Sequence, residues 1–440
     1  MPKLKVVTFG CQANELDSAR IIGLLAREGY SLTDDEGEAD LIILNGCSIR
    51  DKAEQKLYSR LGTLQSLKAR QPGLRLGVAG CLGQREGETL LRRFPYLDLV
   101  VGNGEHLAEI PRLLSAADVR PPSATSEPVG LFPANVEVHR DSPFRAWVGV
   151  MEGCDNFCAF CVVPHTRGRE RSRPPDEILR EVADLRDRRF REITLLGQTV
   201  NSYGMKLDPP VSFAALLRGV DRVVGREVRV RFTTSHPKDV TAELAEAMAA
   251  LPCVCPHMHL PVQSGSSRTL ARMERTYSRE EYLEKARLLT AAVPDLSLTT
   301  DIIVGFPGES DEDFAQTLSL MREVNFDASF AFKFSPRPDT PTADFADQVS
   351  DSVRAERLAA VLSLQDELSL QKNRGWIGRR VEVLVDRGLS KRASGLAAGR
   401  TPQNKIVHFG GGEVEEGALA NVQITEATSH HMKGVLIPSS

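Results

Sequence analysis

Three cysteines stand on one short loop, within the stretch from Met151 to Cys161. Cys154, Cys158 and Cys161 have the spacing CxxxCxxC, and thiolates at such intervals can converge on one soft metal centre. A ferredoxin cluster has four thiolates and a structural zinc site fills its fourth position, whereas this loop offers three. The spacing therefore indicates a cubane cluster that leaves one iron open for a substrate. The alternatives are a zinc knuckle completed by His165 and a reduced surface loop without metal.

A second set of three cysteines recurs at the ends of predicted strands. Between residues 4 and 115, apolar runs end in Gly-Cys at Cys11, Cys47 and Cys81. Helical patterns are predicted at Leu16–Glu28, Asp51–Arg70, Glu86–Phe94 and from Glu105. This alternation is typical of βαβ units on an open parallel sheet, whose strands gather ligands at their carboxyl ends. We therefore predict a second open cluster site; the alternative is three core or loop cysteines that share the pattern by coincidence.

The first cysteine loop is predicted to belong to an α/β barrel. Probable strands are Ala146–Met151, Glu192–Leu196, Val228–Phe232, His257–Leu260, Leu296–Val304 and Ala328–Phe334, with helices at Pro175–Arg189 and Asp311–Val324 among those between them. Six such units predict a partial (β/α)6 version of the (β/α)8 barrel, whose chemistry sits at the carboxyl ends of the strands. The cysteine loop follows the first strand, so we expect it at that end.

The remaining segments define the predicted domain organisation. Residues 119–141 lack periodicity and are rich in proline and serine, which predicts a linker. After Arg374 the predicted strands are short, at Arg380–Val385, Gly395–Gly399, Lys405–Phe409, Ala420–Ala427 and Lys433–Ile437. They predict a small OB-like β-barrel, a common RNA-binding shape, with a packing module as the alternative. The α/β chain is thus predicted to comprise a sheet domain at 1–118, a linker, a barrel domain at 142–373 and a β-barrel domain at 374–440.

Composition and charge bound the class of protein. The 440 residues are 41% hydrophobic and 26% charged, which is typical of a soluble globular chain. The start Met-Pro-Lys-Leu-Lys runs into a strand-like segment, and no apolar run approaches the roughly 20 residues of a membrane span, so we expect neither signal peptide nor membrane anchor. Eight cysteines in such a chain indicate a reducing compartment and metal ligation, which predicts a cytoplasmic protein.

Basic residues suggest where a polyanion would bind. The net charge is −4, but the segment after residue 373 has 9 Lys and Arg against 6 Asp and Glu. Four arginines also follow the cysteine loop, where they are able to grip phosphates. We predict RNA contacts at Arg167, Arg169, Arg171, Arg173, Arg400 and Lys405. A solvated charge run is the usual alternative.

The CxxxCxxC loop, with Phe160 just before its last cysteine, resembles that of the radical S-adenosylmethionine (SAM) enzymes. Nearly the whole chain is similar to the methylthiotransferase family, which implies a C-terminal TRAM domain. The stretches Thr8–Ser18, Val162–Arg173, Arg231–Pro237 and His259–Ser266 resemble the branch that acts on isopentenylated adenosine beside the tRNA anticodon. Gln12 and Ala13 argue against the sister branch that modifies a ribosomal-protein aspartate.

The sequence departs from the pattern of that branch at three positions. Ala13 stands where methionine is usual, Gly46 replaces threonine and Thr199 replaces asparagine. None of the three is a cluster cysteine. We therefore expect these departures to affect substrate contacts and to leave the cluster ligands untouched.

The resemblance implies two [4Fe-4S] clusters and SAM as cofactors. Adenine C2 carries an unactivated C–H bond, so a cofactor must supply a radical. By analogy, the Cys154/Cys158/Cys161 cluster cleaves SAM to a 5′-deoxyadenosyl radical, while the Cys11/Cys47/Cys81 cluster presents the methylthio group. The implied SAM contacts are Phe160, Gly197, Gln198, Ser235, Gln263, Ile303 and Gly305. The implied partners are a tRNA substrate and an electron donor such as a flavodoxin or ferredoxin, and we expect a monomer.

Two alternatives remain. One is the same methylthiotransferase chemistry on another substrate, either threonylcarbamoyladenosine in tRNA or a ribosomal-protein aspartate. The other is a non-catalytic RNA-binding metal protein. Anaerobically purified protein that is brown and binds iron and sulfide would support the radical chemistry, whereas a colourless zinc protein would support the last alternative.

Overall fold

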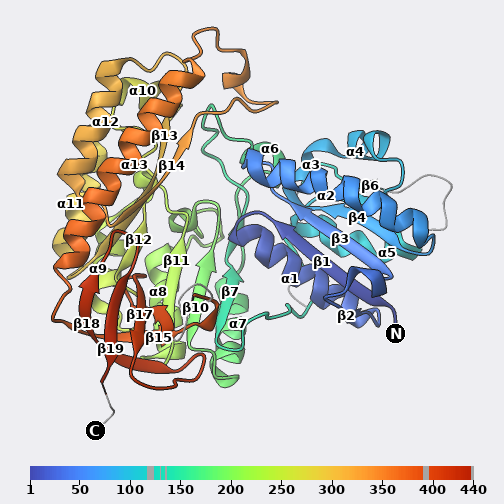
Figure 1. Ribbon diagram of the computed structural model, residues 1–440, viewed down its shortest axis with the longest axis horizontal. Helices are drawn as coiled ribbons and strands as arrows, with labels where there is room; N and C mark the ends of the chain where they lie inside the picture. Colours follow the sequence, from blue (N-terminus) through green and yellow to red (C-terminus); the bar gives the residue numbers. More distant parts are fainter. Residues whose placement is uncertain (116–122, 129, 134–135, 390–395, 438–440) are drawn as a thin grey trace.

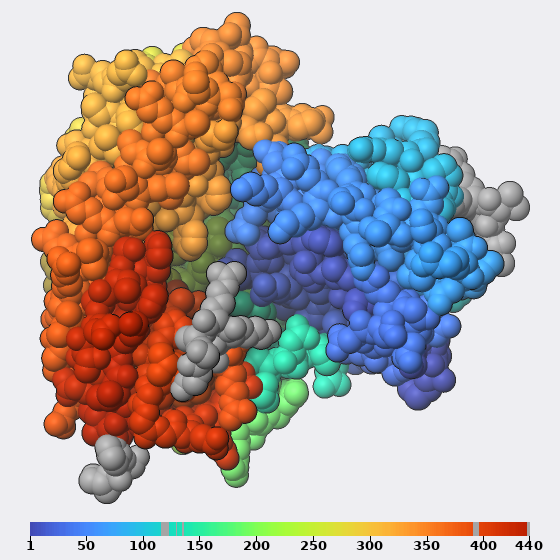
Figure 2. Space-filling model, viewed as in Figure 1, coloured from blue at the N-terminus to red at the C-terminus, as the bar shows by residue number. Residues whose placement is uncertain are grey.

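The computed structural model describes residues 1–115, 123–128, 130–133, 136–389 and 396–437. It contains a six-stranded sheet, two three-stranded sheets, a two-stranded ribbon and a closed five-stranded barrel. The N-terminal sheet and its helices form one lobe beside a larger lobe built from the other elements (Figure 1). The surface is hollowed where the two lobes meet (Figure 2). None of the described helices is long and apolar enough to cross a bilayer. The predicted fold class is confirmed.

The N-terminal sheet is parallel throughout, in the order β2-β1-β3-β4-β5-β6. Successive side chains along each strand point to opposite faces of the sheet, so apolar residues form a core on each face. One core contains Ile21 of α1 and the other Leu57 of α2. The elements are β1 (Lys3–Phe9), α1 (Gln12–Arg27), β2 (Ser31–Leu32), β3 (Leu41–Gly46), α2 (Asp51–Arg70), β4 (Arg75–Ala79), α3 (Gly80–Glu86), α4 (Glu88–Arg93), β5 (Leu99–Val101), α5 (Ile110–Ser115) and β6 (Ser123–Ala124).

The segment predicted as a linker contributes to the N-terminal lobe. Ser123–Ala124 is β6, the edge strand of the sheet, and Phe132 and Val136 are buried in the same core as Ile21. The sequence shows neither a helical nor a strand period here, because only a few apolar residues of the segment pack against the lobe. The prediction of a linker therefore missed this packing. The Arg120-Pro-Pro part of the predicted linker lies outside the described residues.

Six parallel strands form the predicted partial barrel. One sheet has the order β11-β10-β7 and the other β12-β13-β14. They are joined where the Val230 N–H donates to the Cys253 carbonyl (2.7 Å) and the Cys255 N–H donates to the Val230 carbonyl (2.9 Å). The elements are β7 (Arg145–Gly149), β8 (Met151–Glu152), α6 (Val163–Arg167), β9 (Arg171–Ser172), α7 (Pro175–Asp187), β10 (Glu192–Leu196), α8 (Phe213–Val224), β11 (Arg229–Thr233), α9 (Ala242–Ala250), β12 (His257–His259), α10 (Ser267–Arg272), α11 (Arg279–Ala292), β13 (Ser297–Val304), α12 (Asp311–Val324) and β14 (Ala328–Lys333).

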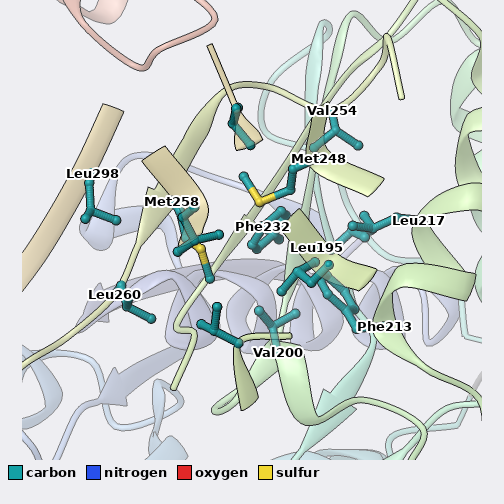
Figure 3. Close-up of a cluster of buried hydrophobic side chains, with 14 of the residues drawn as sticks. Leu195, Val200, Phe213, Leu217, Phe232, Met248, Val254, Met258, Leu260 and Leu298 are labelled. Atoms are coloured by element: carbon teal, nitrogen blue, oxygen red, sulfur yellow. The ribbon is translucent and has the colours of Figure 1, made fainter. Parts of the chain in front are cut away.

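The barrel strands separate apolar from polar side chains. Leu195 of β10 and Phe232 of β11 lie among Phe213 and Leu217 of α8 and Met248 of α9, so this face packs against the outer helices (Figure 3). Residues at the intervening positions face the other way, into the barrel, where Arg231 Nε donates to Glu192 Oε2 (2.7 Å). Alternation with period two therefore gives the barrel an apolar shell and a polar interior.

The C-terminal barrel is closed, in the order β15-β16-β17-β19-β18. Its strands pair antiparallel except β17 with β19, which are parallel. All five strands were predicted, although Gly395, the predicted start of the second, lies outside the described residues. The elements are α13 (Asp351–Arg374), which leads into the barrel, and β15 (Arg380–Val385), β16 (Ala397–Arg400), β17 (Ile406–Gly410), β18 (Leu419–Ala427) and β19 (Met432–Leu436).

The loop from Arg400 to Lys405 is packed against the amino ends of the partial-barrel strands. Arg231 donates to the carbonyls of Thr401 (2.8 Å) and Pro402 (2.7 Å). Lys405 Nζ lies 2.7 Å from Asp327 Oδ1, just before β14, and both side chains are less than a tenth exposed. The loop predicted to lie on an RNA-binding face thus closes the end of the barrel opposite to the cysteine loop.

We expect Lys405→Met to lower the free energy of unfolding by about 1.5–3 kcal/mol, because it removes a charged hydrogen bond from a buried carboxylate. The loss should stay below that of a fully unpaired charge, since Lys372 Nζ remains 2.6 Å from Asp327 Oδ2. The matched control is Lys433→Met, which breaks an exposed pair with Glu426 and should cost less than about 1 kcal/mol. Urea denaturation measures both; equal losses would contradict the buried docking contact.

Candidate active site

The first cysteine triad lies at the carboxyl ends of three neighbouring strands. Cys11 follows β1 as the N-cap of α1, and Cys47 directly follows β3. Cys81 is the second residue of α3, a helix that was not predicted, whereas the predicted helix at Glu86–Phe94 corresponds to α4. Gly80 allows this early turn: its φ is +88°, and a Cβ there would lie 2.1 Å from Asn45 Oδ1.

The three thiols of this triad influence one another. A hydrogen bond with Cys47 lowers the pKa of Cys11 to about 5, while the same contact raises the pKa of Cys47. Burial raises the pKa of Cys81, and the nearby Cys11 raises it further. Backbone and amide groups also reach the sulfurs: the Ile49 N–H lies 3.3 Å from Cys47 Sγ and Asn103 Nδ2 3.7 Å from Cys81 Sγ. The sheet therefore groups the three thiols as predicted.

The second triad occupies the loop after β8. Cys154 and Cys158 are buried and Cys161 is half-buried. Burial and, to a smaller extent, repulsion from Cys158 raise the pKa of Cys161 to about 12. The loop leaves β8 through Gly153, whose φ is +77° and where a Cβ would lie 2.0 Å from the Arg169 carbonyl oxygen. This close approach fixes the start of the loop against the chain that follows it.

Polar side chains contact two of these sulfurs. Asn156 Nδ2 lies 3.4 Å from Cys154 Sγ and 3.2 Å from Thr199 Oγ1, and Thr199 Oγ1 is itself 3.4 Å from Cys154 Sγ. Arg275 Nη1 lies 3.4 Å from Cys158 Sγ. The expectation that the departures leave the cluster ligands untouched is therefore wrong for Thr199, because β10 ends beside the cysteine loop.

Each triad offers three thiols, the ligand type of an iron–sulfur cluster, in which each thiolate binds a different iron. Among the described residues, neither these triads nor any other group of three or more Cys, His, Asp or Glu side chains is arranged to hold a single metal ion. His165, the suggested fourth zinc ligand, is exposed. The other two cysteines, Cys253 and Cys255, are buried before β12, on the amino side of the barrel.

Several predicted SAM contacts end in buried polar atoms without a hydrogen-bond partner among the described residues. These atoms are Gln198 Oε1, Ser235 Oγ and Gln263 Oε1. They follow β10, β11 and β12, so they stand on the side of the barrel where the cysteine loop lies. Buried polar groups are normally hydrogen-bonded, so unpaired ones in a row of strand ends fit a polar ligand.

The other predicted SAM contacts are apolar or glycine. Phe160 and Ile303 both pack against the cluster of Met273, Phe306 and Phe334, with Phe160 and Phe306 ring centroids 6.5 Å apart. Gly197 follows β10 beside Met151. Gly305 follows β13, and its N–H donates to Glu309 Oε2 (2.6 Å). Phe160 and Ile303 thus share one apolar wall beside the last cysteine of the loop.

A buried set of alternating charges joins the two lobes between the triads. Arg167 Nη2 of α6 donates to Asp17 Oδ2 of α1 (2.6 Å), and both side chains are at most 5% exposed. Asp17 also accepts from Arg20, which pairs with Glu152 of β8. Burial alone would raise the pKa of Glu152, but Arg20 and Arg167 lower it below its ordinary value. Asn103 adds a neutral contact, since its Nδ2 also donates to the Thr166 carbonyl (2.9 Å).

The arginines predicted to bind RNA do not share one surface. Arg169 has 63% of its side chain exposed, although it pairs with Asp155 at 2.7 Å. Arg171 donates to the Pro128 carbonyl (3.0 Å), and Arg173 donates to the Gly149 carbonyl (2.6 Å) and to Glu181 (2.7 Å). Arg167 is buried as described, and Arg400 and Lys405 lie in the loop that docks on the barrel. Of the six basic residues, Arg169 is thus the one placed with most of its side chain in solvent.

Sequence reasoning missed the residues that surround the sulfurs. Asn156 lies inside the cysteine loop, so its position offered a signal. Asn103 and Arg275 come from segments distant in sequence, and nothing in their local pattern marks them. Asp17 follows Cys11 by six positions on a helix, and its partner is revealed only by the packing of the two lobes.

Two family models match parts of the chain. Residues 148–321 match the model described as Radical SAM superfamily, and residues 3–102 match Uncharacterized protein family UPF0004. Among solved structures, the radical S-adenosylmethionine methyltransferase TsrM from Kitasatospora setae superposes with a TM-score of 0.57 at 14% identity, covering 90% of this chain and 81% of that chain. The cobalamin-dependent radical enzyme OxsB gives a TM-score of 0.51 at 14% identity, covering 84% of this chain and 56% of that chain. At such identities the likeness concerns the fold alone.

Curated relatives match over nearly their full length. The tRNA-2-methylthio-N(6)-dimethylallyladenosine synthase of Syntrophobacter fumaroxidans is 48% identical, covering 99% of this chain and 95% of the relative. The proteins of that name from Geobacter metallireducens and a Thermoanaerobacter species are 47% and 44% identical, each over 98% of this chain and over 98% and 92% of the relatives. The predicted resemblance to methylthiotransferases is confirmed. The chain belongs to the family of the tRNA-2-methylthio-N(6)-dimethylallyladenosine synthases.

Proposed function

We propose that this protein adds a methylthio group to C2 of N(6)-dimethylallyladenosine next to the anticodon of tRNA. The names of the relatives and the match to the Radical SAM model support this activity. The observation that carries it is the pairing of two cysteine triads, one on each lobe, across an interface joined by Arg167 and Asp17. A reaction with two half-steps on one nucleoside requires two such centres within reach of one substrate.

We propose that each triad holds one [4Fe-4S] cluster. Cys11, Cys47 and Cys81 would hold the cluster that serves sulfur transfer, and Cys154, Cys158 and Cys161 the one that binds SAM. Three protein thiolates leave one iron without a protein ligand in each cluster. When bound, such a cluster supplies the electron that cleaves SAM to the radical needed at an unactivated carbon. Thiols become thiolates on metal binding, so loading of either triad releases protons.

We propose that SAM lies along the carboxyl ends of β10 to β13. The unpaired atoms of Gln198, Ser235 and Gln263 would donate to or accept from its polar groups. Phe160 and Ile303 would cover an apolar surface of the bound molecule, with Gly197 and Gly305 at the strand ends beside them. These side chains orient the ligand and exclude water from the cleavage site; the chemistry itself belongs to the cofactors.

The proposed partners follow from the same activity. The tRNA would approach the hollow between the lobes (Figure 2), and Arg169 offers an exposed charge on the segment that follows the cysteine loop. A flavodoxin or ferredoxin would supply electrons, and the protein would act in the cytoplasm as a monomer. We also propose 1–118, 142–373 and 374–440 as the functional units of the chain, connected by the segment 119–141, whose β6 joins the N-terminal sheet.

We expect Cys158→Ala to abolish 5′-deoxyadenosine formation, because the remaining two thiols do not hold the cluster that binds SAM. Iron content after anaerobic reconstitution should fall by about half, since the first triad is untouched. The matched control is Cys253→Ala, which removes another buried thiol without touching either triad and should keep both iron and turnover. Wild-type rates of reductive SAM cleavage in Cys158→Ala would refute the assignment of this triad.

We expect Arg169→Ala to weaken tRNA binding and to reduce the slope of log K against log salt by about 1, because one phosphate contact is lost. The control is Arg188→Ala, which removes a similarly exposed ion-paired arginine from the end of α7. Binding titrations at several salt concentrations distinguish the two. An unchanged affinity and slope in Arg169→Ala would move the RNA contact away from the segment after the cysteine loop.

A further inference from the structure

Arg275 connects the turn after α10 to the second cysteine loop. Its Nη1 lies 3.4 Å from Cys158 Sγ, its Nε donates to the Tyr277 hydroxyl (2.9 Å) and its Nη2 donates to the Pro261 carbonyl (3.0 Å). The same turn contacts the loop through its backbone, because the Ala159 N–H donates to the Met273 carbonyl (3.0 Å). Two contacts, one from the main chain and one from a guanidinium, thus hold the segment around Cys158.

The contacts with Tyr277 and Pro261 and the backbone conformation of the preceding residue fix the direction of the Arg275 guanidinium. Tyr277 is buried, and its hydroxyl donates to the carbonyls of Val262 (3.0 Å) and Pro261 (3.3 Å), so the Nε contact leads to a rigid partner. Glu274, just before Arg275, has a φ of +56°, a left-handed backbone conformation in the turn that follows α10. The geometry therefore aims one N–H of the guanidinium at the sulfur.

The charge of Arg275 lacks a local counterion. Its acceptors are a phenol, a carbonyl and a thiol, and among the residues that the structure describes no carboxylate forms an ion pair with it. Placing the half-buried Arg275 cation without a carboxylate partner costs folding free energy unless another negative charge lies beside it. Thiols lose their protons on metal binding, so the loaded triad would supply that negative charge.

We propose that Arg275 is a positioning residue that stabilises the reduced form of the SAM-binding cluster through its hydrogen bond to Cys158. The inference rests on the proposed function, in which this triad holds that cluster. One electron passes from a low-potential one-electron donor to the cluster, which becomes one charge more negative. A guanidinium hydrogen bond to a ligand sulfur favours the more negative state, because such bonds and the net charge set cluster potentials.

The test is a redox titration of the reconstituted full-length protein, monitored by electron paramagnetic resonance. The signal of the SAM-binding cluster is first identified as the one that changes when SAM is added, and the titration itself is done without SAM. We expect Arg275→Met to disfavour reduction about tenfold, which corresponds to a midpoint about 59 mV more negative. Arg275→Lys keeps the charge but not the planar donor group, and should lie between this variant and the wild type. Iron and sulfide contents establish that the variants are loaded.

The matched control is Arg279→Met. Arg279 donates to the carbonyls of Gly265 (3.1 Å) and Gln316 (2.6 Å) and pairs with Glu323, so it stabilises the same region without contacting a cysteine in the structure. Its midpoint should equal that of the wild type. An unchanged midpoint in Arg275→Met, an equal shift in both methionine variants, or a shift seen only with SAM bound would each overturn the proposal. A wild-type protein without any SAM-responsive signal would instead refute the proposed function.

Discussion

The buried ion pair of Arg167 with Asp17 sets the relation between the two lobes. A charge removed from water must be paired, and both residues are almost fully buried, so neither can separate without a cost of several kcal/mol. Asp17 stands on the helix that Cys11 caps, and Arg167 ends the short helix that follows Cys161. One salt bridge therefore ties together the segments that hold the two cysteine triads. Arg20, Glu152 and Asn103 extend the same joint on either side.

The C-terminal barrel acts at the other end of the molecule. It packs its Arg400–Lys405 loop against the amino ends of the partial-barrel strands, through Arg229, Arg231 and Asp327. The carboxyl ends of these strands, with the unpaired polar atoms of Gln198 and Ser235, remain on the side of the cysteine loop. Ligands and substrate therefore have one end of the barrel available. A polar interior and an apolar shell make that arrangement compatible with a stable core.

The fold was predictable from sequence where local pattern and packing agree. The strand Glu192–Leu196 and the helix Asp311–Val324 were predicted with their observed bounds. The spacing of apolar residues that indicates a strand or a helix lies within each segment itself. The grouping of Cys11, Cys47 and Cys81 was predictable because parallel strands end at one edge. The burial of the arginines after Cys161 was not predictable: Arg167 is buried against Asp17, which is distant in sequence, whereas Arg169 pairs with the nearby Asp155 and stays exposed. Arg275 reaches Cys158 by a tertiary contact that no local motif encodes.

The central claim is that the two triads serve separate half-reactions on one nucleoside. Its most direct test replaces Cys11, Cys47 and Cys81 with alanine and measures 5′-deoxyadenosine and methylthiolated adenosine together after anaerobic reconstitution with tRNA and SAM. The account predicts that 5′-deoxyadenosine is still formed, because the barrel keeps its own cysteine loop, while the nucleoside stays without sulfur. Methylthiolated adenosine at wild-type yield would contradict it.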